Sequence, residues 1–350
     1  MKKYAGLDVS MEETSVCVID EEGKVVAEAK VASDPAAIAD YLARWREELV
    51  RVGLEAGGLS PWLWHGLTER GLPAVCIETR RMKAYAKASP VKTDRRDARL
   101  IGLALRAGLY REVHVKSEDS QKLRLALTAR QTVLRQARQL QGKVRGDLKP
   151  FGIRLGKVGS GGFAGRVKEL LARRPDLWVL VRPLIELRAV LLEQVRAYDR
   201  MLRGFARTDA VCRRLMTAPG VGVLTAVGFR ATIGSTPTAL NPARFRRAAD
   251  VPVALGLTPR IDQSGERERC GAITKAGDQL MRGLLFEAAN ALLTRTRRSC
   301  ALKRWGLALA KRRGLNRARV AVARKLAIVL HRMWRDGAEF RFAAAANQAA

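Results

Sequence analysis

Short apolar runs alternate with polar turns over the first part of the chain. Residues 4–9, 14–20 and 24–31 are rich in β-branched side chains, which predicts a three-stranded meander. The same patterns predict five further elements: a helix over 35–50, a strand over 52–55, a helix over 63–70, a strand over 73–77 and a helix over 94–107. Strands interleaved with helices predict an α/β domain over residues 1–118.

The spacing of apolar residues becomes helical after that point. Apolar positions three and four apart run through 123–148 and again through 184–205. Both runs predict long helices of coiled-coil or bundle type, so residues 119–210 are expected to form a helical coiled-coil connector. Five of the ten residues in 156–165 are glycine, and we expect a flexible linker there.

The last third of the chain is predicted to be a mostly α domain over residues 211–341, followed by a low-complexity tail over 342–350 that frays. Within it, Gly220 and Gly222 resemble the hairpin glycines of helix-hairpin-helix modules, where backbone N–H groups hold a phosphate. An ordinary turn between two helices explains these glycines equally well.

Charge indicates what the chain binds. The sequence has 65 Lys and Arg against 34 Asp and Glu, a formal net charge of +31, and only 5% aromatic residues. So large an excess favours a polyanion, and few aromatic side chains argue against stacking on single strands, so duplex nucleic acid is the expected partner. The first 60 residues are the exception, with 7 basic and 12 acidic residues. Carboxylates beside phosphates require a chemical reason.

Cysteine and apolar content exclude several classes of protein. The five cysteines lie far apart without a C-x-x-C pair, and three histidines offer little to share a zinc, so we expect a reducing compartment. No stretch approaches the roughly 18 apolar residues of a membrane span. We therefore expect a cytoplasmic chain with no membrane partner. There is no phosphate-loop motif to support ATP hydrolysis.

Four carboxylates suggest a metal site. Asp8 and Glu55 end two predicted strands, and such ends can meet at one sheet edge. Asp94 and Asp97, three residues apart, share a face of a predicted helix. Four carboxylates at one point would repel unless divalent cations neutralised them, and two Mg²⁺ ions can stabilise both oxygens of a phosphodiester displacement. As simple caps of strands and helices, the same acids would have no catalytic role.

Three segments around these acids carry a family resemblance: Gly6-Leu7-Asp8-Val9-Ser10, Gly53-Leu54-Glu55-Ala56-Gly57 and Lys92-Thr93-Asp94-Arg95-Arg96-Asp97-Ala98. In order and spacing they resemble the DEDD transposases of the insertion sequence 110 family and the related Piv-type DNA invertases. The resemblance implies a RuvC-like, ribonuclease-H-type domain whose four acids bind Mg²⁺, or Mn²⁺ in its place.

The far end of the chain resembles the C-terminal transposase domain of the same family. The matching segments are 244–245, 255–260, 263–265, 273–278 and 280–282. We expect Ser264 in a loop, where a serine before glycine is by itself usually a turn residue. The resemblance implies instead that Ser264 attacks the phosphodiester and carries DNA as a phosphoserine. Its activation would fall to the metal and carboxylates, from the same or another protomer.

Basic residues surround Ser264 in the sequence and would screen the phosphates near it. Together with the two hairpin glycines, they form the predicted nucleic-acid contacts: Gly220, Gly222, Arg244, Arg246, Arg247, Arg260, Arg267, Arg269, Lys275 and Arg282.

These observations predict a DNA transposase or site-specific recombinase that cuts and rejoins donor and target DNA. The resemblance further implies a structured noncoding bridge RNA that selects the sequences, and a homo-oligomer, dimer or tetramer, assembled around it. Two alternatives stay open: a metal-dependent nuclease or Holliday-junction resolvase in which water attacks, and a noncatalytic nucleic-acid scaffold whose acids are caps.

Overall fold

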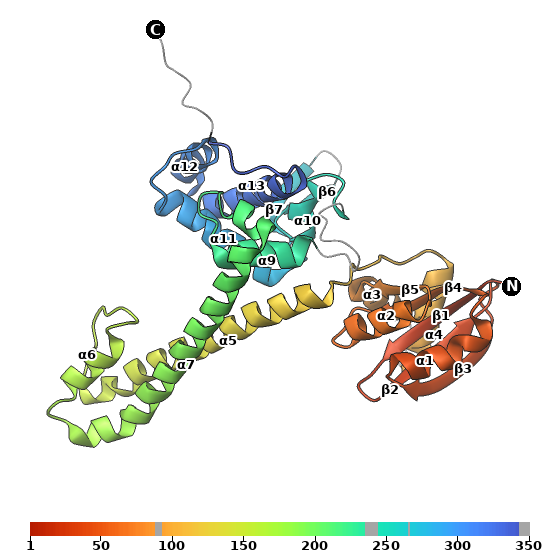
Figure 1. The fold of residues 1–350 in the computed structure, drawn as a ribbon, viewed down its shortest axis with the longest axis horizontal. Helices are drawn as coiled ribbons and strands as arrows, with labels where there is room; N and C mark the ends of the chain where they lie inside the picture. Colours follow the sequence, from red (N-terminus) through yellow and green to blue (C-terminus); the bar gives the residue numbers. More distant parts are fainter. Residues whose placement is uncertain (88–92, 235–243, 265–266, 343–350) are drawn as a thin grey trace, which may run out of the picture. The chain divides into compact units, whose positions relative to one another are not determined.

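The computed structural model describes residues 1–87, 93–234, 244–264 and 267–342, and only the backbone of residues 262, 264, 267 and 268. The chain divides into two compact units, Met1–Lys116 and Ser117–Ala350 (Figure 1). The predicted connector and C-terminal region both belong to the second unit. Several residues named in the sequence analysis lie outside the described ones: Lys92, Gly265 and the tail after Phe342.

The first unit is built on a five-stranded mixed sheet. Its strands, in spatial order, are β3 (Val25–Ala32), β2 (Glu13–Ile19), β1 (Lys3–Val9), β4 (Leu49–Glu55) and β5 (Ala74–Ile77). β2 is antiparallel to both its neighbours, whereas β1, β4 and β5 are parallel. The mixed α/β class expected here is therefore confirmed. Because β1 and β4 are parallel, their carboxyl ends meet at the same edge.

Helices cover both faces of this sheet. They are α1 (Pro35–Leu42), α2 (Ser60–Glu69), α3 (Thr79–Ala86) and α4 (Asp94–Arg106), with a 3-10 turn at Ala43–Trp45. Ala5 and Leu7 of β1 pack in one core with Ile38 of α1, whereas Cys17 of β2 packs on the other face against Ala98 of α4. Neighbouring positions on a strand point to opposite faces, so each strand supplies both cores.

The helix predicted over 35–50 is wrong in its second half. The helix ends at Leu42 and the turn at Trp45, and Leu49 is already part of β4, where it pairs with Lys3 of β1. The apolar spacing continued past the end of the helix because Trp45 and Leu49 fill the same core as Leu42 from different elements.

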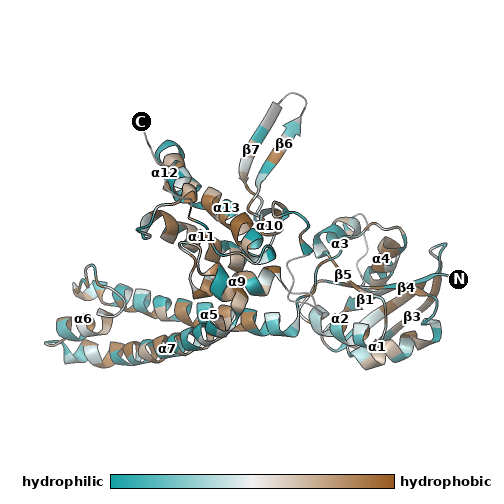
Figure 2. Ribbon diagram, turned by 45° about the horizontal axis from the view of Figure 1, so that its top comes forward, coloured by the Kyte–Doolittle hydropathy of each residue, from teal (hydrophilic) through white to brown (hydrophobic). Residues whose placement is uncertain are grey.

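The second unit begins with two long helices that pack along each other, α5 (Glu118–Asp147) and α7 (Pro175–Thr208). The elements between and after them are a 3-10 turn at Lys149–Phe151, α6 (Phe163–Leu170), α8 (Ala210–Leu215), α9 (Val223–Ile233), α10 (Asp250–Ala254), β6 (Pro259–Ser264), β7 (Arg267–Ile273), α11 (Gln279–Thr294), α12 (Ala301–Arg313) and α13 (Leu315–Arg335). Hydrophobic residues of α9, α11 and α13 meet in the main core (Figure 2).

Residues 156–165 are anchored rather than a free linker. Phe163 begins α6 and is fully buried, in one core with Leu155 and with Ile185 of α7. Arg188 of α7 donates hydrogen bonds to Ser160. The glycine count predicted flexibility, but the buried Phe163 and arginines of two neighbouring helices, Arg145 and Arg188, contact this segment.

The segment around Ser264 is a strand rather than the expected loop. β6 and β7 form a two-stranded antiparallel hairpin in which Ser264, the last residue of β6, pairs with Arg267. Ile261 is 59% exposed, and Arg260 and Arg269 are exposed too. Because the hairpin has little apolar alternation, its strands could not be recognised from the hydrophobic pattern.

Candidate active site and nucleic-acid interface

The register between two parallel strands brings Asp8 and Glu55 together. Gly6 of β1 pairs with Gly53 of β4, and each acid lies two residues further along its own strand. Both glycines face α4, because a Cβ at either would meet atoms of that helix. Residues two apart on a strand point to the same face, so both half-buried carboxylates belong to the face that α4 covers.

Helix α4 packs on β1 at very short distance because Gly6 has no side chain. A Cβ on Gly6 would lie 2.0 Å from the carbonyl oxygen of Ala98 and 2.6 Å from the nitrogen of Gly102. The N-cap of α4 is Thr93, whose hydroxyl accepts a hydrogen bond from the backbone of Arg96 at 3.3 Å. The close contact lies one residue after Asp97 and brings that carboxylate to the same face of the sheet.

One pocket of about 720 Å³ is lined by Asp8, Glu55 and Asp97. The charged residues around them are all cationic: Lys83, Lys87, Arg96 and Arg99. Asp94 is exposed, and one of its carboxylate oxygens lies 3.8 Å from the Lys30 ammonium group. The structure therefore groups three of the four predicted acids and turns the fourth toward the solvent.

The three grouped carboxylates have the donor chemistry of a Mg²⁺ site, since hard carboxylate oxygens are the ligands that this ion prefers. Across the ranges that the structure describes, no three Asp, Glu, His or Cys side chains are close enough to hold a metal ion. A bound ion would have to draw Asp8, Glu55 and Asp97 together. The donor set fits the ion, and all three acids line the same pocket.

Helix α3 supplies pocket residues that the sequence analysis missed. Lys83 and Tyr85 line the pocket, and Lys87 follows at the end of the helix. Met82 is the only buried side chain of α3, so no apolar periodicity reveals the helix. The available signal was a cluster of basic residues directly before the Asp94 and Asp97 motif.

The base of the β6–β7 hairpin is tightly held, and Ser264 lies at the opposite end. The backbone N–H of Thr274 donates to the carbonyl of Thr258 at 2.8 Å. A Cβ at Gly277 would lie 2.2 Å from the carbonyl oxygen of Ala254, so only glycine permits this approach. The hairpin is thus anchored to α10 and the start of α11.

The predicted phosphate-binding residues divide into separate groups. Lys275 and Arg282 line a groove of about 1310 Å³ that α5, α11 and their neighbours form. Arg135 and Arg138 of α5 line the same groove and were missed, because on a long helix they resemble ordinary solvent-facing charges. The other predicted arginines lie elsewhere: Arg244, Arg246 and Arg247 line another pocket, and Arg260, Arg267 and Arg269 are on the hairpin.

The contact of Gly220 with α11 explains this glycine without a ligand. Its φ is +84°, and a Cβ there would lie 2.4 Å from the carbonyl oxygen of Ala288. Gly222 differs, because it is exposed, precedes the first turn of α9 and has open space where a Cβ would stand. Packing thus supports the ordinary-turn interpretation for Gly220.

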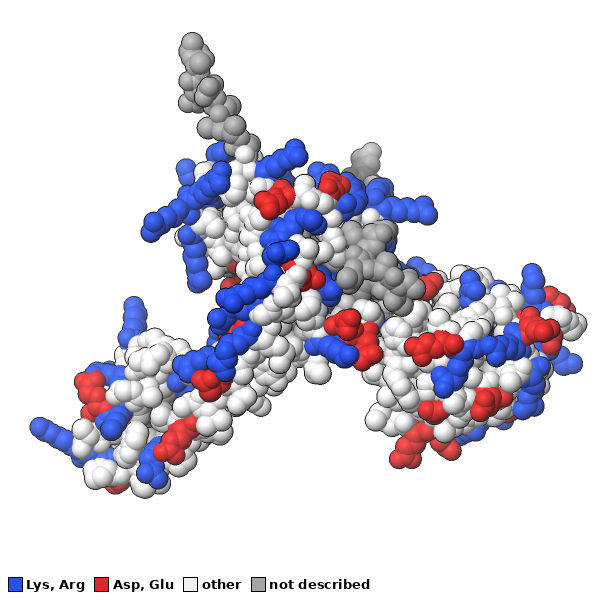
Figure 3. Space-filling view, viewed as in Figure 1, with Lys and Arg blue, Asp and Glu red and all other residues white. Residues whose placement is uncertain are grey.

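Charge separates the two units. Residues 1–116 contain 19 basic and 17 acidic residues, whereas residues 117–350 contain 46 basic and 17 acidic residues. In Figure 3, blue side chains follow α7 and surround α12, and red and blue are mixed on the first unit. Among the described residues, no helix is both long and apolar enough to cross a bilayer. The excess of positive charge therefore lies mainly in the second unit.

Comparisons with protein families match both ends of the chain. A protein-family model described as a transposase matches residues 5–151. A second family model, described as a transposase of the IS116/IS110/IS902 family, matches residues 212–305. The first match includes the three pocket acids and Asp94, and the second includes Ser264.

Similar proteins cover almost the whole chain. A transposase for insertion sequence element IS1111A from Coxiella burnetii is 30% identical over 338 residues, which is 94% of this chain and 88% of the relative. A probable family 20 transposase from Pseudomonas aeruginosa is 28% identical over 335 residues, 93% of this chain and 94% of the relative. Among solved structures, 32% of this chain matches all of a chain of T. thermophilus RuvC in complex with a Holliday junction substrate, with 16% identity and a TM-score of 0.26, a likeness too weak to support an inference.

Proposed function

We propose that this chain, which belongs to the IS116/IS110/IS902 family of transposases, cuts and rejoins DNA by strand transfer through a phosphoserine on Ser264. The observation that supports the proposal is one pocket whose lining includes Asp8, Glu55 and Asp97 together with Lys and Arg side chains. Carboxylates that share a site with cations suit a divalent metal and the phosphate it binds. The first unit would then act as a RuvC-like, ribonuclease-H-type domain.

Asp8, Glu55 and Asp97 would hold Mg²⁺ or Mn²⁺, and Asp94 would join them after releasing Lys30. When bound, the ion would neutralise charge on the phosphate and favour loss of the serine proton. Lys83 and Lys87 of the pocket would orient the DNA backbone through its phosphate oxygens, without reading the bases.

The chemistry at Ser264 is an exchange of phosphate esters. The hydroxyl oxygen of Ser264 forms a bond to phosphorus, the bond from phosphorus to a deoxyribose oxygen breaks, and the serine proton ends on that departing oxygen. A DNA hydroxyl then reverses these steps and releases the serine. The number of phosphodiester bonds is conserved, so the reaction needs no ATP. The position of Ser264 at the end of an anchored hairpin supports a role in contacting DNA.

Partner molecules are proposed on charge and on exposed apolar surface. The 46 basic residues of 117–350 would hold donor and target DNA and a structured bridge RNA. Exposed apolar residues recur on α7, at Leu180, Leu187, Val190 and Met201. This spacing suits pairing with a second copy, and so supports a dimer or tetramer.

Trapping the covalent intermediate tests the proposal. Incubation with a suicide substrate, whose released strand diffuses away, should leave a protein–DNA adduct in the presence of Mg²⁺. Ser264→Ala should give no adduct, and the exposed Ser299→Ala should behave like the parent protein. Cleavage by Ser264→Ala with free DNA ends would support a nuclease or resolvase that uses water instead.

A further inference from the structure

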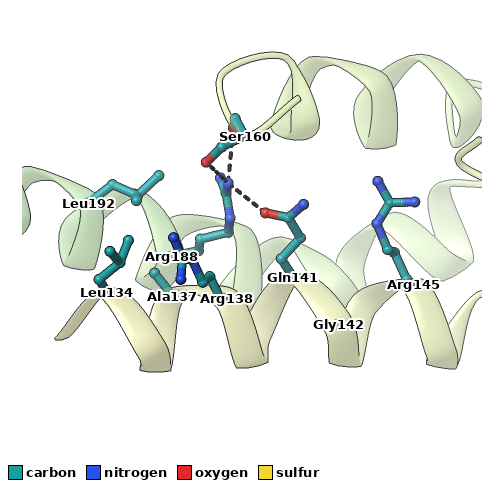
Figure 4. A pocket seen from close by; sticks show the side chains of 9 residues that line it. All are labelled: Leu134, Ala137, Arg138, Gln141, Gly142, Arg145, Ser160, Arg188 and Leu192. Carbon is teal, nitrogen blue, oxygen red and sulfur yellow. Dashed lines mark hydrogen bonds between the residues drawn. The ribbon is translucent and has the colours of Figure 1, made fainter. Parts of the chain in front are cut away.

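An arginine is buried where α5, α6 and α7 meet, and no carboxylate of the described residues pairs with it. Arg188 of α7 is only 4% exposed. Its Nη2 donates to Gln141 Oε1 at 3.0 Å and to the carbonyl and hydroxyl oxygens of Ser160 at 2.9 and 2.8 Å (Figure 4). Its Nε is buried and has no hydrogen-bond acceptor. Burial lowers the pKa of this guanidinium, and no described carboxylate counteracts that effect.

Arg188 lines a pocket of about 440 Å³ that contains no acidic side chain. The other lining residues are Leu134, Ala137, Arg138, Gln141, Gly142, Arg145, Ser160 and Leu192. Three arginines therefore share one pocket, and Figure 4 shows Arg188 and Gln141 reaching toward the segment that carries Ser160. Their combined positive charge has no counterpart within the pocket.

Part of this arrangement has a structural explanation. Arg145 donates to the carbonyl of Gly156 at 2.9 Å, and the guanidinium carbons of Arg145 and Arg188 lie 5.5 and 4.9 Å from the centre of the Phe163 ring. These contacts fasten residues 156–163 and account for Arg145 and for Nη2 of Arg188. They do not supply a hydrogen-bond acceptor for Nε of Arg188. They also do not explain the exposed Arg138.

A buried charge is costly unless a partner of opposite charge compensates it. Because no carboxylate among the described residues pairs with Arg188, the compensating group is best supplied from outside the protein. The planar fork of a guanidinium matches the oxygens of a phosphate, and such charge-assisted hydrogen bonds are strong. Arg138 also lines the large basic groove that contains Lys275 and Arg282, so the two features join along α5.

We infer that this pocket binds a phosphate group of a nucleic-acid backbone, held by Arg138 and Arg188. The inference rests on the proposed function only in that its ligand is nucleic acid. It requires neither the metal nor Ser264. The paired helices α5 and α7 would then extend the nucleic-acid-binding surface beyond the groove that Lys275 lines.

Binding of labelled duplex DNA and of a labelled RNA hairpin to the full chain tests this inference, in EDTA so that no strand is cut. Arg138→Gln and Arg188→Gln should each weaken the binding of at least one probe about 10-fold. The salt dependence of that binding should fall by about one unit of slope, as expected for the loss of one phosphate contact. The salt dependence of the double variant should show the loss of no more than one phosphate contact, because both side chains hold the same phosphate group. Arg203→Gln, an exposed charge on α7, is the matched control and should change Kd less than about 2-fold.

Equal effects of the three single substitutions would overturn the inference. The inference would also fail if only Arg188→Gln bound more weakly and its Tm were lower. Arg188 would then serve only to hold the Ser160 segment. A further measurement adds inorganic phosphate as a competitor at constant ionic strength. If phosphate raises the Tm of the parent but neither probe distinguishes the variants, the pocket takes a free anion and the nucleic-acid assignment fails. The adduct assay, performed with Mg²⁺, separately reports failure of the strand-transfer proposal.

Discussion

Asp8 and Glu55 are the next residues after a paired stretch of two parallel strands, and both line one pocket with Asp97. Far apart in the chain, the two acids become neighbours because β1 and β4 run in the same direction. Lys83, Lys87, Arg96 and Arg99 line that pocket too. Positive charges in the same pocket offset the repulsion among the acids when no metal is bound.

Replacing Asp8 with asparagine should abolish strand cleavage while leaving DNA binding intact. The substitution keeps the size of the side chain and removes one negative charge from the proposed metal site. We expect cleavage to fall by at least about 100-fold, as for other groups that stabilise a transition state electrostatically. Gel assays of cleavage and of binding measure the two effects. Asp40→Asn, an exposed acid on α1, should retain full activity, and cleavage by Asp8→Asn would contradict the site.

Gly6→Ala should destabilise the first unit by about 1–3 kcal/mol, the usual cost of overpacking. The new methyl group would meet backbone atoms of Ala98 and Gly102, which cannot move aside like a flexible side chain. Chemical denaturation monitored by circular dichroism measures the loss. Gly58→Ala is the control, because nothing lies within 4 Å of a Cβ there. Equal stability of the two variants would refute the close packing of α4.

Asp278→Ala should lower the stability of the second unit by about 2–4 kcal/mol. One carboxylate oxygen of Asp278 accepts a hydrogen bond from the backbone of Met281 at 2.9 Å and caps α11. The other lies 2.5 Å from Arg124 of α5, with both side chains largely buried. The substitution removes the cap and leaves Arg124 without its carboxylate partner.

The unfolding midpoint in urea, compared between Asp278→Ala and Asp176→Ala, provides the measurement. Asp176 also pairs with a nearby arginine, Arg174, but on the surface. Its loss should therefore cost much less than that of Asp278. A similar shift for both variants would show that Asp278 does not connect α5 to α11.

The first unit should lose stability as the pH rises above 9. Burial raises the pKa of Cys17 to about 12 and that of Cys76 to about 11, from a usual value of 9.0. Above pH 9 the unfolded chain releases thiol protons that the folded chain retains, so the free energy of unfolding falls with rising pH. Each thiol contributes at most about 1.4 kcal/mol per pH unit between pH 9 and its folded pKa.

Urea unfolding at pH 8, 9 and 10 measures this slope. Replacing Cys17 and Cys76 together with alanine should flatten it, whereas Cys270→Ala should leave it unchanged because Cys270 is exposed. If the double replacement kept the full slope, other groups would be responsible.

Local periodicity predicted many of the elements that turn one face toward a core, although the start of α6, with its buried Phe163, was predicted to be part of a linker. β1, β2 and β5 and the helix that carries Asp97 all follow such patterns. Helix α3 and the β6–β7 hairpin escaped prediction because they bury few apolar side chains. Residues 156–165 were misjudged for a related reason, since the arginine that holds Ser160 comes from a different helix.

The sequence by itself determined the α/β start, the two long helices, the family and the order of the four acids, because these depend on spacing along the chain. Only the tertiary structure decided that Asp97 faces the pocket while Asp94 pairs with Lys30. The rotation of α4 about its axis is set by its contact with Gly6, and three residues on a helix turn two side chains about 60° apart. That no described carboxylate pairs with Arg188 also depends on which distant segments pack around it, and no local pattern in the sequence shows this.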